Sequence, residues 1–152
     1  ALAELADELA AAPTLYDLGA AHSRAAQLLG ADDVSLMCVD RDTDELVLVA
    51  PSTTTDAGRR WRLADFPATR FVLEQRVAGQ VVAGDEAGDD AELAELAALG
   101  FGAVVIVPVV YAGGQLAVLE VYRVRAQAFT AREIDRARVL AQQFAAALDR
   151  LS

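Results

Sequence analysis

The sequence predicts an α+β fold in which helices cover both faces of an antiparallel sheet. The main observation is segment 101–125, FGAVVIVPVVYAGGQLAVLEVYRVR, where two apolar runs flank Ala112, Gly113 and Gly114. Valine, isoleucine and tyrosine suit strands, and paired glycines supply the positive φ angles of a tight hairpin. Side chains on both faces of the second run are apolar, so each face needs a covering layer. Apolar stripes at helical spacing near both ends of the chain supply candidates for these layers.

Composition limits the class of protein. The chain has 152 residues, 55% of them hydrophobic, which predicts one domain with a substantial core. The net charge of −10 disfavours nucleic acid or an anionic membrane as the main partner. No apolar run approaches the ~20 residues that a membrane span needs. All thirteen basic residues are arginines, and the single cysteine, Cys38, cannot form an internal disulfide, which fits a reducing cytoplasm. The chain starts on Ala1 without a methionine, so we expect a piece of a longer protein.

Two helices are predicted at the start of the chain. Residues 1–12 carry leucines at helical spacing, and Pro13 ends that helix. A second helix is expected to begin at Thr14, which stands in capping-box spacing with Asp17, and to end at Gly30.

The middle of the chain alternates short strands and helices. The expected order is strand 34–40, turn 41–44, strand 45–50, loop 51–60, edge strand 61–63, helix 66–77, strand 81–83, acidic loop 84–90 and helix 91–99. Asp65 is expected to cap the helix that has Pro67 in its first turn. Pro108 lies inside the first strand of the hairpin, where we expect a bulge or an unpaired edge position.

The last helix has the strongest local signals. Thr130 and Glu133 form a predicted capping box, after which apolar residues repeat at heptad-like spacing. These residues are Ile134, Ala137, Ala141, Phe144, Leu148 and Leu151. Two interpretations stay open: the stripe packs on the sheet of its own subunit, or it also pairs with a partner subunit.

Three local patterns in order resemble a GAF domain, a sensory relative of the PAS fold. They are LLGAD at residues 28–32, Val-Pro-Val at 107–109 ahead of the paired glycines, and Phe-Thr-x-x-Glu at 129–133. The resemblance covers about residues 14–151 and implies a five- to six-stranded sheet of order 2-1-5-4-3. It also implies terminal helices on one face, a ligand pocket under the connecting helices on the other, and dimerisation through the terminal helices. We expect residues 1–13 to be a linker or signalling helix and residues 14–152 to be the sensory domain.

The chain lacks the residue sets that catalysis, metal binding or the known cofactors of this family would need. Cys38 lies alone in an apolar strand, whereas the sulfoxide reductases that resemble GAF domains need several cysteines. His22, the only histidine, has no serine-elbow motif to serve, and one histidine plus one cysteine do not make a metal site. Cyclic-nucleotide-binding GAF domains need an Asn-Lys pair that this chain lacks. Asp65-Phe66-Pro67 resembles the Asp-Ile-Pro of chromophore-binding members, but no cysteine or histidine lies nearby to hold a bilin or haem. We therefore expect no enzyme activity, metal or cofactor.

The predicted ligand-binding residues surround the middle helix. They are Trp61, Asp65, Phe66, Thr69, Arg70 and Glu120. A helix start beside an arginine is a plausible carboxylate or phosphate site, while the aromatic residues offer apolar area. Glu120 stands among apolar residues of a central strand, where an unpaired carboxylate is costly. The competing interpretation is that these residues only pack and the pocket is empty.

Two functions follow from these expectations. The first is a non-catalytic module of a bacterial signalling protein, which senses an unknown small molecule and relays the signal to an effector domain elsewhere in the full-length chain. The alternative is a structural homodimerisation module with a vestigial pocket.

Overall fold

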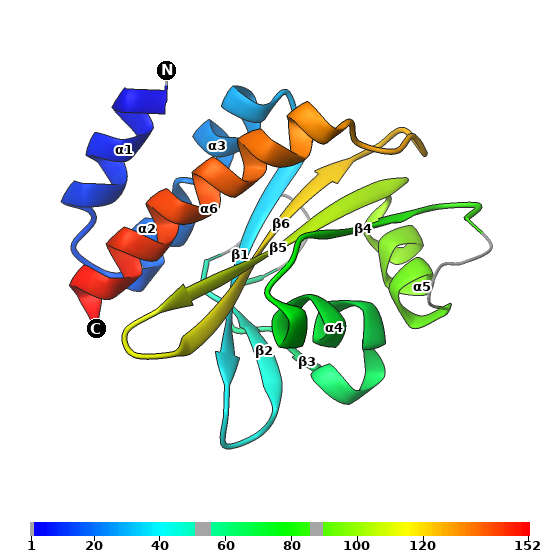
Figure 1. Cartoon of the computed structure of the whole chain (residues 1–152), viewed down its shortest axis with the longest axis horizontal. Helices are drawn as coiled ribbons and strands as arrows, with labels where there is room; N and C mark the ends of the chain where they lie inside the picture. Colours follow the sequence, from blue (N-terminus) through cyan, green and yellow to red (C-terminus); the bar gives the residue numbers. More distant parts are fainter. Residues whose placement is uncertain (1, 51–55, 86–89) are drawn as a thin grey trace.

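The computed structural model describes residues 2–50, 56–85 and 90–152 (Figure 1). Its strands are β1 (Asp33–Asp40), β2 (Glu45–Leu48), β3 (Arg60–Arg62), β4 (Gly79–Val82), β5 (Ala103–Tyr111) and β6 (Gln115–Arg123). Its α-helices are α1 (Leu2–Ala11), α2 (Leu15–Ala20), α3 (His22–Leu29), α4 (Pro67–Gln75), α5 (Asp90–Leu99) and α6 (Ala131–Leu151). A 3-10 turn, Leu63–Asp65, precedes α4.

The six strands form one antiparallel sheet of order β3-β2-β1-β6-β5-β4. This is the predicted order 2-1-5-4-3 with the short edge strand β3 counted in the numbering. The predicted α+β fold is therefore confirmed.

The β5–β6 hairpin forms the centre of the sheet together with β1. Tyr111 pairs with Gln115, and all three turn residues between them have positive φ angles, as the paired glycines predict. Pro108 pairs in regular register with Val118 on the β6 side. On the other side β4 pairs only as far as Ile106, so Pro108 occupies the unpaired edge position that its missing N–H requires.

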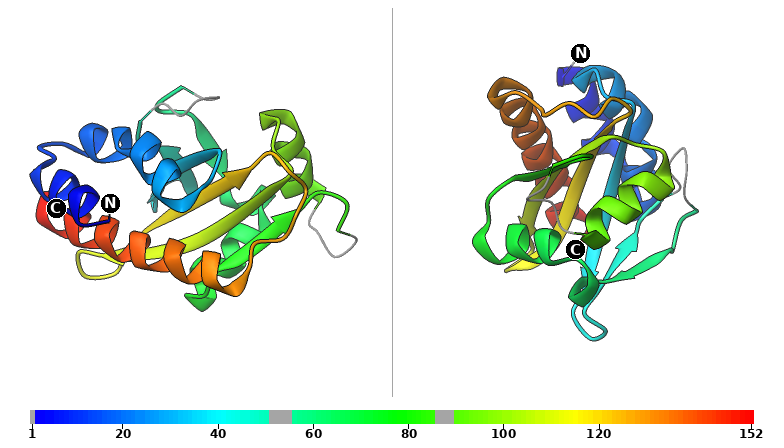
Figure 2. Two further views of the ribbon diagram at one scale, coloured as in Figure 1. Left: turned by 90° about the horizontal axis from the view of Figure 1, so that it is seen from above. Right: turned by 90° about the vertical axis from the view of Figure 1, so that its right-hand side faces the viewer.

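Helices cover both faces of this sheet, and each face has its own core (Figure 2). Helices α1, α2, α3 and α6 pack on the face that carries Ala117, Leu119 and Val121 of β6. Helices α4 and α5 pack on the opposite face, which carries Val118 and Tyr122. Because successive side chains of β6 point to opposite faces of the sheet, this one strand contributes to both cores.

The apolar stripe of α6 packs within its own subunit. Ala137, Ala141, Phe144 and Leu148 are buried in the larger core, with Ile134 and Leu151 at its margin. Helix α1 packs against α6 and buries its leucines Leu5 and Leu9 in the same core. The two stripes that suggested a partner subunit are therefore occupied by intramolecular contacts.

Local structure departs from expectation at several points. The predicted helix 14–30 is two helices, divided at Ala21. Gly19 of α2 packs against Ala50, two residues after the end of β2. A Cβ added at Gly19 would lie 2.9 Å from the Cβ of Ala50. The expected capping by Thr14 is present, since its hydroxyl accepts a hydrogen bond from the Asp17 amide at 3.2 Å. Parts of the predicted loops, residues 51–55 and 86–89, lie outside the described residues.

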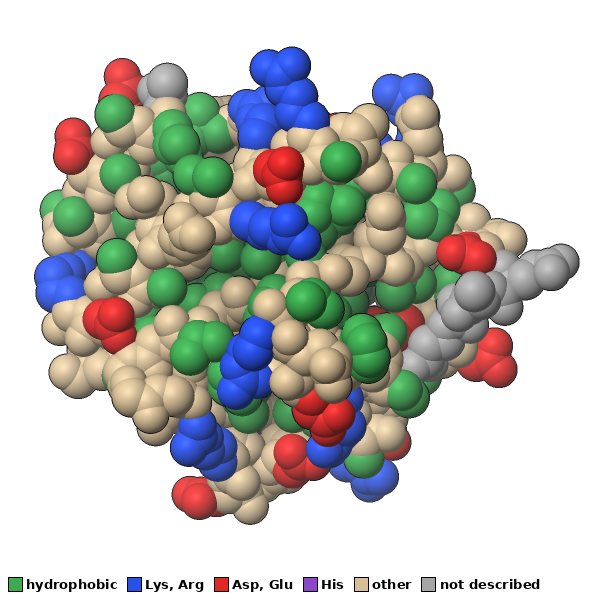
Figure 3. Space-filling view, in the orientation of Figure 1, with side chains coloured by type: hydrophobic (Ala, Val, Ile, Leu, Met, Phe, Trp, Pro, Cys, Tyr) green, Lys and Arg blue, Asp and Glu red, His purple; other side chains and the backbone are tan. Residues whose placement is uncertain are grey.

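The surface has mixed charge. Figure 3 shows arginines and acidic side chains interspersed over one face, with apolar side chains between them. Within the described ranges, no helix combines the length and apolar character that crossing a membrane requires.

The packing of α6 predicts a clear contrast between two of its residues. Phe144 is 1% exposed and Val139 is 41% exposed. Phe144→Ala should lower the free energy of unfolding by about 3–5 kcal/mol through loss of burial and a residual cavity. Val139→Ala should change it by less than about 1 kcal/mol. Urea denaturation of both variants measures this, and a larger effect at Val139 would mean that the outer face of α6 is buried by a partner.

Candidate functional site

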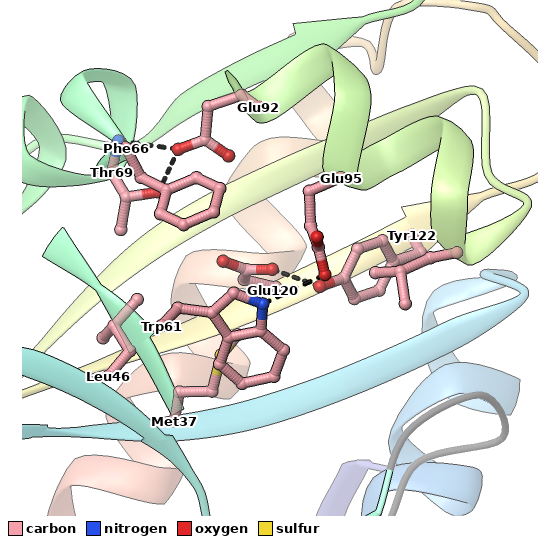
Figure 4. Close-up of a pocket in the computed structure, with 10 residues that line it drawn as sticks. Met37, Leu46, Trp61, Phe66, Thr69, Glu92, Glu95, Glu120 and Tyr122 are labelled. Carbon is pink, nitrogen blue, oxygen red and sulfur yellow. Dashed lines mark hydrogen bonds between the residues drawn. The ribbon is translucent and has the colours of Figure 1, made fainter. Parts of the chain in front are cut away.

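A cavity lies between the sheet and helices α4 and α5 (Figure 4). Its walls are Met37, Leu46, Trp61, Phe66, Thr69, Glu92, Glu95, Leu99, Glu120 and Tyr122. The volume open to the centre of a water molecule is about 30 Å³. That is room for roughly two waters.

Glu120 extends from β6 into this cavity and is 8% exposed. Its Oε2 accepts a hydrogen bond from the Tyr122 hydroxyl, two residues along the same face of the strand. Burial raises the pKa of Glu120 to about 8, and the negative charge of Glu92 and then Glu95 adds to the rise, against the effect of the Tyr122 hydrogen bond. Desolvation favours the neutral acid, so Glu120 is mostly protonated at neutral pH in the empty cavity.

The side chain of Glu92, from α5, lies at the amino end of α4. Its Oε1 accepts hydrogen bonds from the backbone N–H of Thr69, at 3.1 Å, and from the Thr69 hydroxyl. Thr69 lies in the first turn of α4, where backbone donors lack intrahelical partners. The anion site predicted at this helix start is therefore filled by the chain's own carboxylate.

Glu95 lies one helical turn further along α5 and faces Trp61. The Trp61 indole Nε1 donates to Glu95 Oε1 at 3.0 Å. Arg59 Nη2 lies 3.1 Å from the same oxygen, and the Arg59 guanidinium carbon lies 4.7 Å from the centre of the Trp61 ring. Trp61 and Glu95 thus hold a guanidinium at the side of the cavity, where Arg59 is about half exposed.

The structure brings together four of the six predicted residues: Trp61, Phe66, Thr69 and Glu120. The other two lie elsewhere. Asp65 is exposed, pairs with Arg62, and does not cap α4, whose N-cap Phe66 has no side-chain cap bond. The capping prediction for Asp65 is wrong because Glu92 supplies the acceptor instead.

Arg70 also points away from the cavity. It pairs with Asp44 and lies 4.0 Å from Glu74. Helical geometry explains this, because adjacent residues on a helix differ by about 100° in direction and Thr69 faces the cavity. The predicted combination of helix start and arginine is therefore not assembled.

Six residues of the cavity were not foreseen: the apolar Met37, Leu46 and Leu99, and the polar Glu92, Glu95 and Tyr122. The Glu92–Glu95 spacing places both carboxylates on one face of α5, a signal present in the sequence. Tyr122 stands two residues from Glu120, which puts both on one face of β6.

Other reactive groups lie away from this cavity. Cys38 is on the opposite face of the sheet, and burial raises the pKa of its thiol. His22 Nδ1 lies 3.7 Å from Asp33 Oδ1 without a hydrogen-bond partner among the described residues. The described ranges contain no cluster of three or more His, Cys, Asp or Glu able to hold a metal.

The fold and the cavity define an α+β domain with an antiparallel sheet, helices on both faces and a small cavity on one of them. The family model described as GAF domain matches residues 19–148. The chain belongs to the GAF domain family, as the sequence patterns predicted. Comparison with curated proteins gave no significant match.

Solved structures share this fold at low identity. The phycocyanobilin-bound GAF domain of a cyanobacterial phytochrome has a TM-score of 0.80 and 15% identity, covering 99% of this chain and 95% of that one. The GAF domain of a phosphoenolpyruvate-protein phosphotransferase from Coxiella burnetii has a TM-score of 0.81 and 20% identity, covering 98% and 90%. The GAF domain of a two-component sensor histidine kinase from Bacillus halodurans has a TM-score of 0.70 and 15% identity, and the match covers 99% of this chain and 95% of that one.

The raised pKa of Glu120 predicts how stability depends on pH. The folded-state pKa is about 8, above the ordinary value of 4.5, so the contribution of the protonated acid is complete at low pH and is lost between about pH 4.5 and 8. Glu120→Gln removes this loss, so the variant should gain roughly 2–4 kcal/mol relative to the parent between pH 5 and pH 9.

Urea denaturation at both pH values measures the difference. Glu74→Gln, an exposed carboxyl on α4, is the matched control and should track the parent at both pH values. Parallel pH profiles for the parent and Glu120→Gln would contradict a buried, protonated Glu120.

Proposed function

We propose that this domain is a non-catalytic small-molecule sensor that relays ligand binding from the cavity to α6 through strand β6. The observation that carries the proposal is the order of residues on β6. Glu120 and Tyr122 line the cavity, and the next residue, Arg123, binds the start of α6. A displacement of Tyr122 at the cavity wall would therefore act directly on its neighbour Arg123, which contacts the terminal helix.

Arg123 makes several contacts at this junction. Its guanidinium pairs with Glu133 and lies 4.0 Å from the centre of the Phe129 ring. Glu133 belongs to the capping box, where it accepts from the Thr130 N–H at 2.9 Å while the Thr130 hydroxyl accepts from the Glu133 N–H at 3.2 Å. Arg123 of β6 thus contacts the loop before α6 and a capping residue of α6, which makes it a direct physical link between the cavity strand and the terminal helix.

The family supports the sensory role. Its structural neighbours include domains of a phytochrome and a sensor histidine kinase, which are signalling proteins. By this analogy we place the domain in a longer bacterial signalling protein, in the cytoplasm, with an effector domain elsewhere in the full-length chain.

The ligand differs from that of the bilin-bound neighbours. No cysteine or histidine lines the cavity as described, and the space of about 30 Å³ is far below the size of a tetrapyrrole.

The alternative function, a structural homodimerisation module, is less well supported than the sensory function. Its motive was the apolar stripes of residues 2–12 and of α6, and most of both stripes packs within the subunit, with Leu2 left exposed. A dimer through the terminal helices would have to use their outer faces, where Leu2 of α1 and Val139 of α6 are exposed.

Ligand screening and amide exchange test the relay together. Trp61 is the only tryptophan and lines the cavity, so its fluorescence reports binding across a metabolite library. A compound that changes this fluorescence should also change hydrogen exchange at residues 129–134. Arg123→Gln should keep the fluorescence response and lose most of the exchange response, because the bridge from β6 to Glu133 is gone.

Arg125→Gln is the matched control, since Arg125 is an exposed arginine two residues further on, and it should behave as the parent does. An exchange response that survives in Arg123→Gln would rule out relay through this contact. A library without any binder would count against sensing itself.

A further inference from the structure

We propose that the cavity under α4 and α5 selects a small organic cation, such as a guanidinium, amidinium or primary ammonium group. The inference rests on the proposed sensory function and specifies its ligand class. It reverses the sequence-based expectation of a carboxylate or phosphate ligand at the start of the middle helix.

The cavity wall is acidic. Glu92 and Glu95 reach it from α5, and Glu120 reaches it from β6. The other lining residues are apolar, aromatic or hydroxyl-bearing, and none of the described lining residues is basic. The acids come from two elements on opposite sides of the cavity, so an entering anion would meet negative charge on the α5 side and would disfavour ionisation of Glu120 on the β6 side.

Glu120 is the group that points to a ligand. Its side chain is more than nine-tenths buried, and only one of its oxygens has a partner, the Tyr122 hydroxyl. The other oxygen has no hydrogen-bond donor among the described residues and faces the cavity (Figure 4). A buried carboxylate without a full set of donors is costly, and a ligand N–H or ammonium would supply the missing donor and the countercharge.

Aromatic rings complete the cation site. Trp61, Phe66 and Tyr122 line the same cavity, and aromatic faces attract cations within about 6 Å of the ring centre. Arg59 already illustrates this recognition, because its guanidinium lies over Trp61 and against Glu95. The pair that holds the chain's own guanidinium on one side therefore has the chemistry to hold a ligand's cation.

Cation binding is coupled to a proton. In the empty cavity Glu120 carries a proton, because burial raises its pKa to about 8, with Glu92 and Glu95 of α5 adding to the rise. Tyr122 of β6 opposes the rise through its hydrogen bond, and Asp33 of β1 acts on Tyr122 in turn. A bound cation favours the carboxylate, so Glu120 releases one proton to the solvent. Affinity should therefore increase with pH up to about 8 and then level off.

Guanidinium and urea form a matched pair of probes, because they are planar, nearly isosteric N–H donors that differ in charge. Each is titrated to 50 mM at constant ionic strength with Trp61 fluorescence as the signal, and sodium acetate serves as the anionic probe. Guanidinium should give a saturable change whose Kd falls about tenfold from pH 6 to pH 7. Urea and acetate should bind at least about tenfold more weakly.

Two variants locate the site. Glu120→Gln keeps the shape of the side chain and should weaken guanidinium binding at pH 8 and abolish its pH dependence. Glu95→Gln should weaken binding while leaving the pH dependence in place. Glu74→Gln, on the exposed side of α4, should bind as the parent does.

The outcomes separate the ligand class from the sensory function. Equal binding of urea and guanidinium, or tighter binding of acetate, overturns the cation proposal, and so does an unchanged Kd in Glu120→Gln. If a neutral or anionic library compound then binds at Trp61, sensing stands with another ligand class. If no compound of any charge affects Trp61, the sensory function itself fails.

Discussion

The β5–β6 hairpin is the constraint on which the rest of the structure depends. Its second strand is apolar on both faces, so neither face of the sheet can be left to solvent. One face takes the long helix α6 with the helices before β1, and the other takes α4 and α5. The register of β6 also decides where its single acid lies. A slip of one residue would move Glu120 into the larger core and turn Leu119 and Val121 toward the cavity.

Elements with local signals could be predicted from the sequence, because the forces that define them act within a few residues. The hairpin turn, the capping box of Thr130 and Glu133, and Pro67 in the first turn of α4 are of this kind. The family patterns then gave the strand order and the location of the cavity. The break at Ala21 escaped prediction because the apolar spacing continues across it, while the fit of Gly19 against Ala50 is a tertiary contact.

The chemistry of the site was harder to predict because it depends on contacts between distant segments. Thr69 was placed correctly near a helix start, but its partner is Glu92, 23 residues away on another helix. The residues near Thr69 in the sequence do not indicate that a carboxylate from another helix will bind there. Asp65 satisfied the local rule for a cap, yet a buried acceptor from α5 replaced it. Arg70 failed for a different reason, since the helical period alone separates it from the face of Thr69.

Each of the three acids of the cavity accepts a hydrogen bond from a neutral side chain, and Glu95 also pairs with Arg59 at the side of the cavity. Thr69 donates to Glu92, Trp61 donates to Glu95, and Tyr122 donates to Glu120. At Glu120 the neutral Tyr122 hydroxyl supplies a hydrogen bond but no positive charge, so it offsets only part of the cost of burying this acid near Glu92 and Glu95. A domain selected for stability alone would replace such groups with apolar residues of similar volume. Acids in an otherwise apolar core are expected where local packing yields to function, and this is the physical basis for the cationic ligand that we propose.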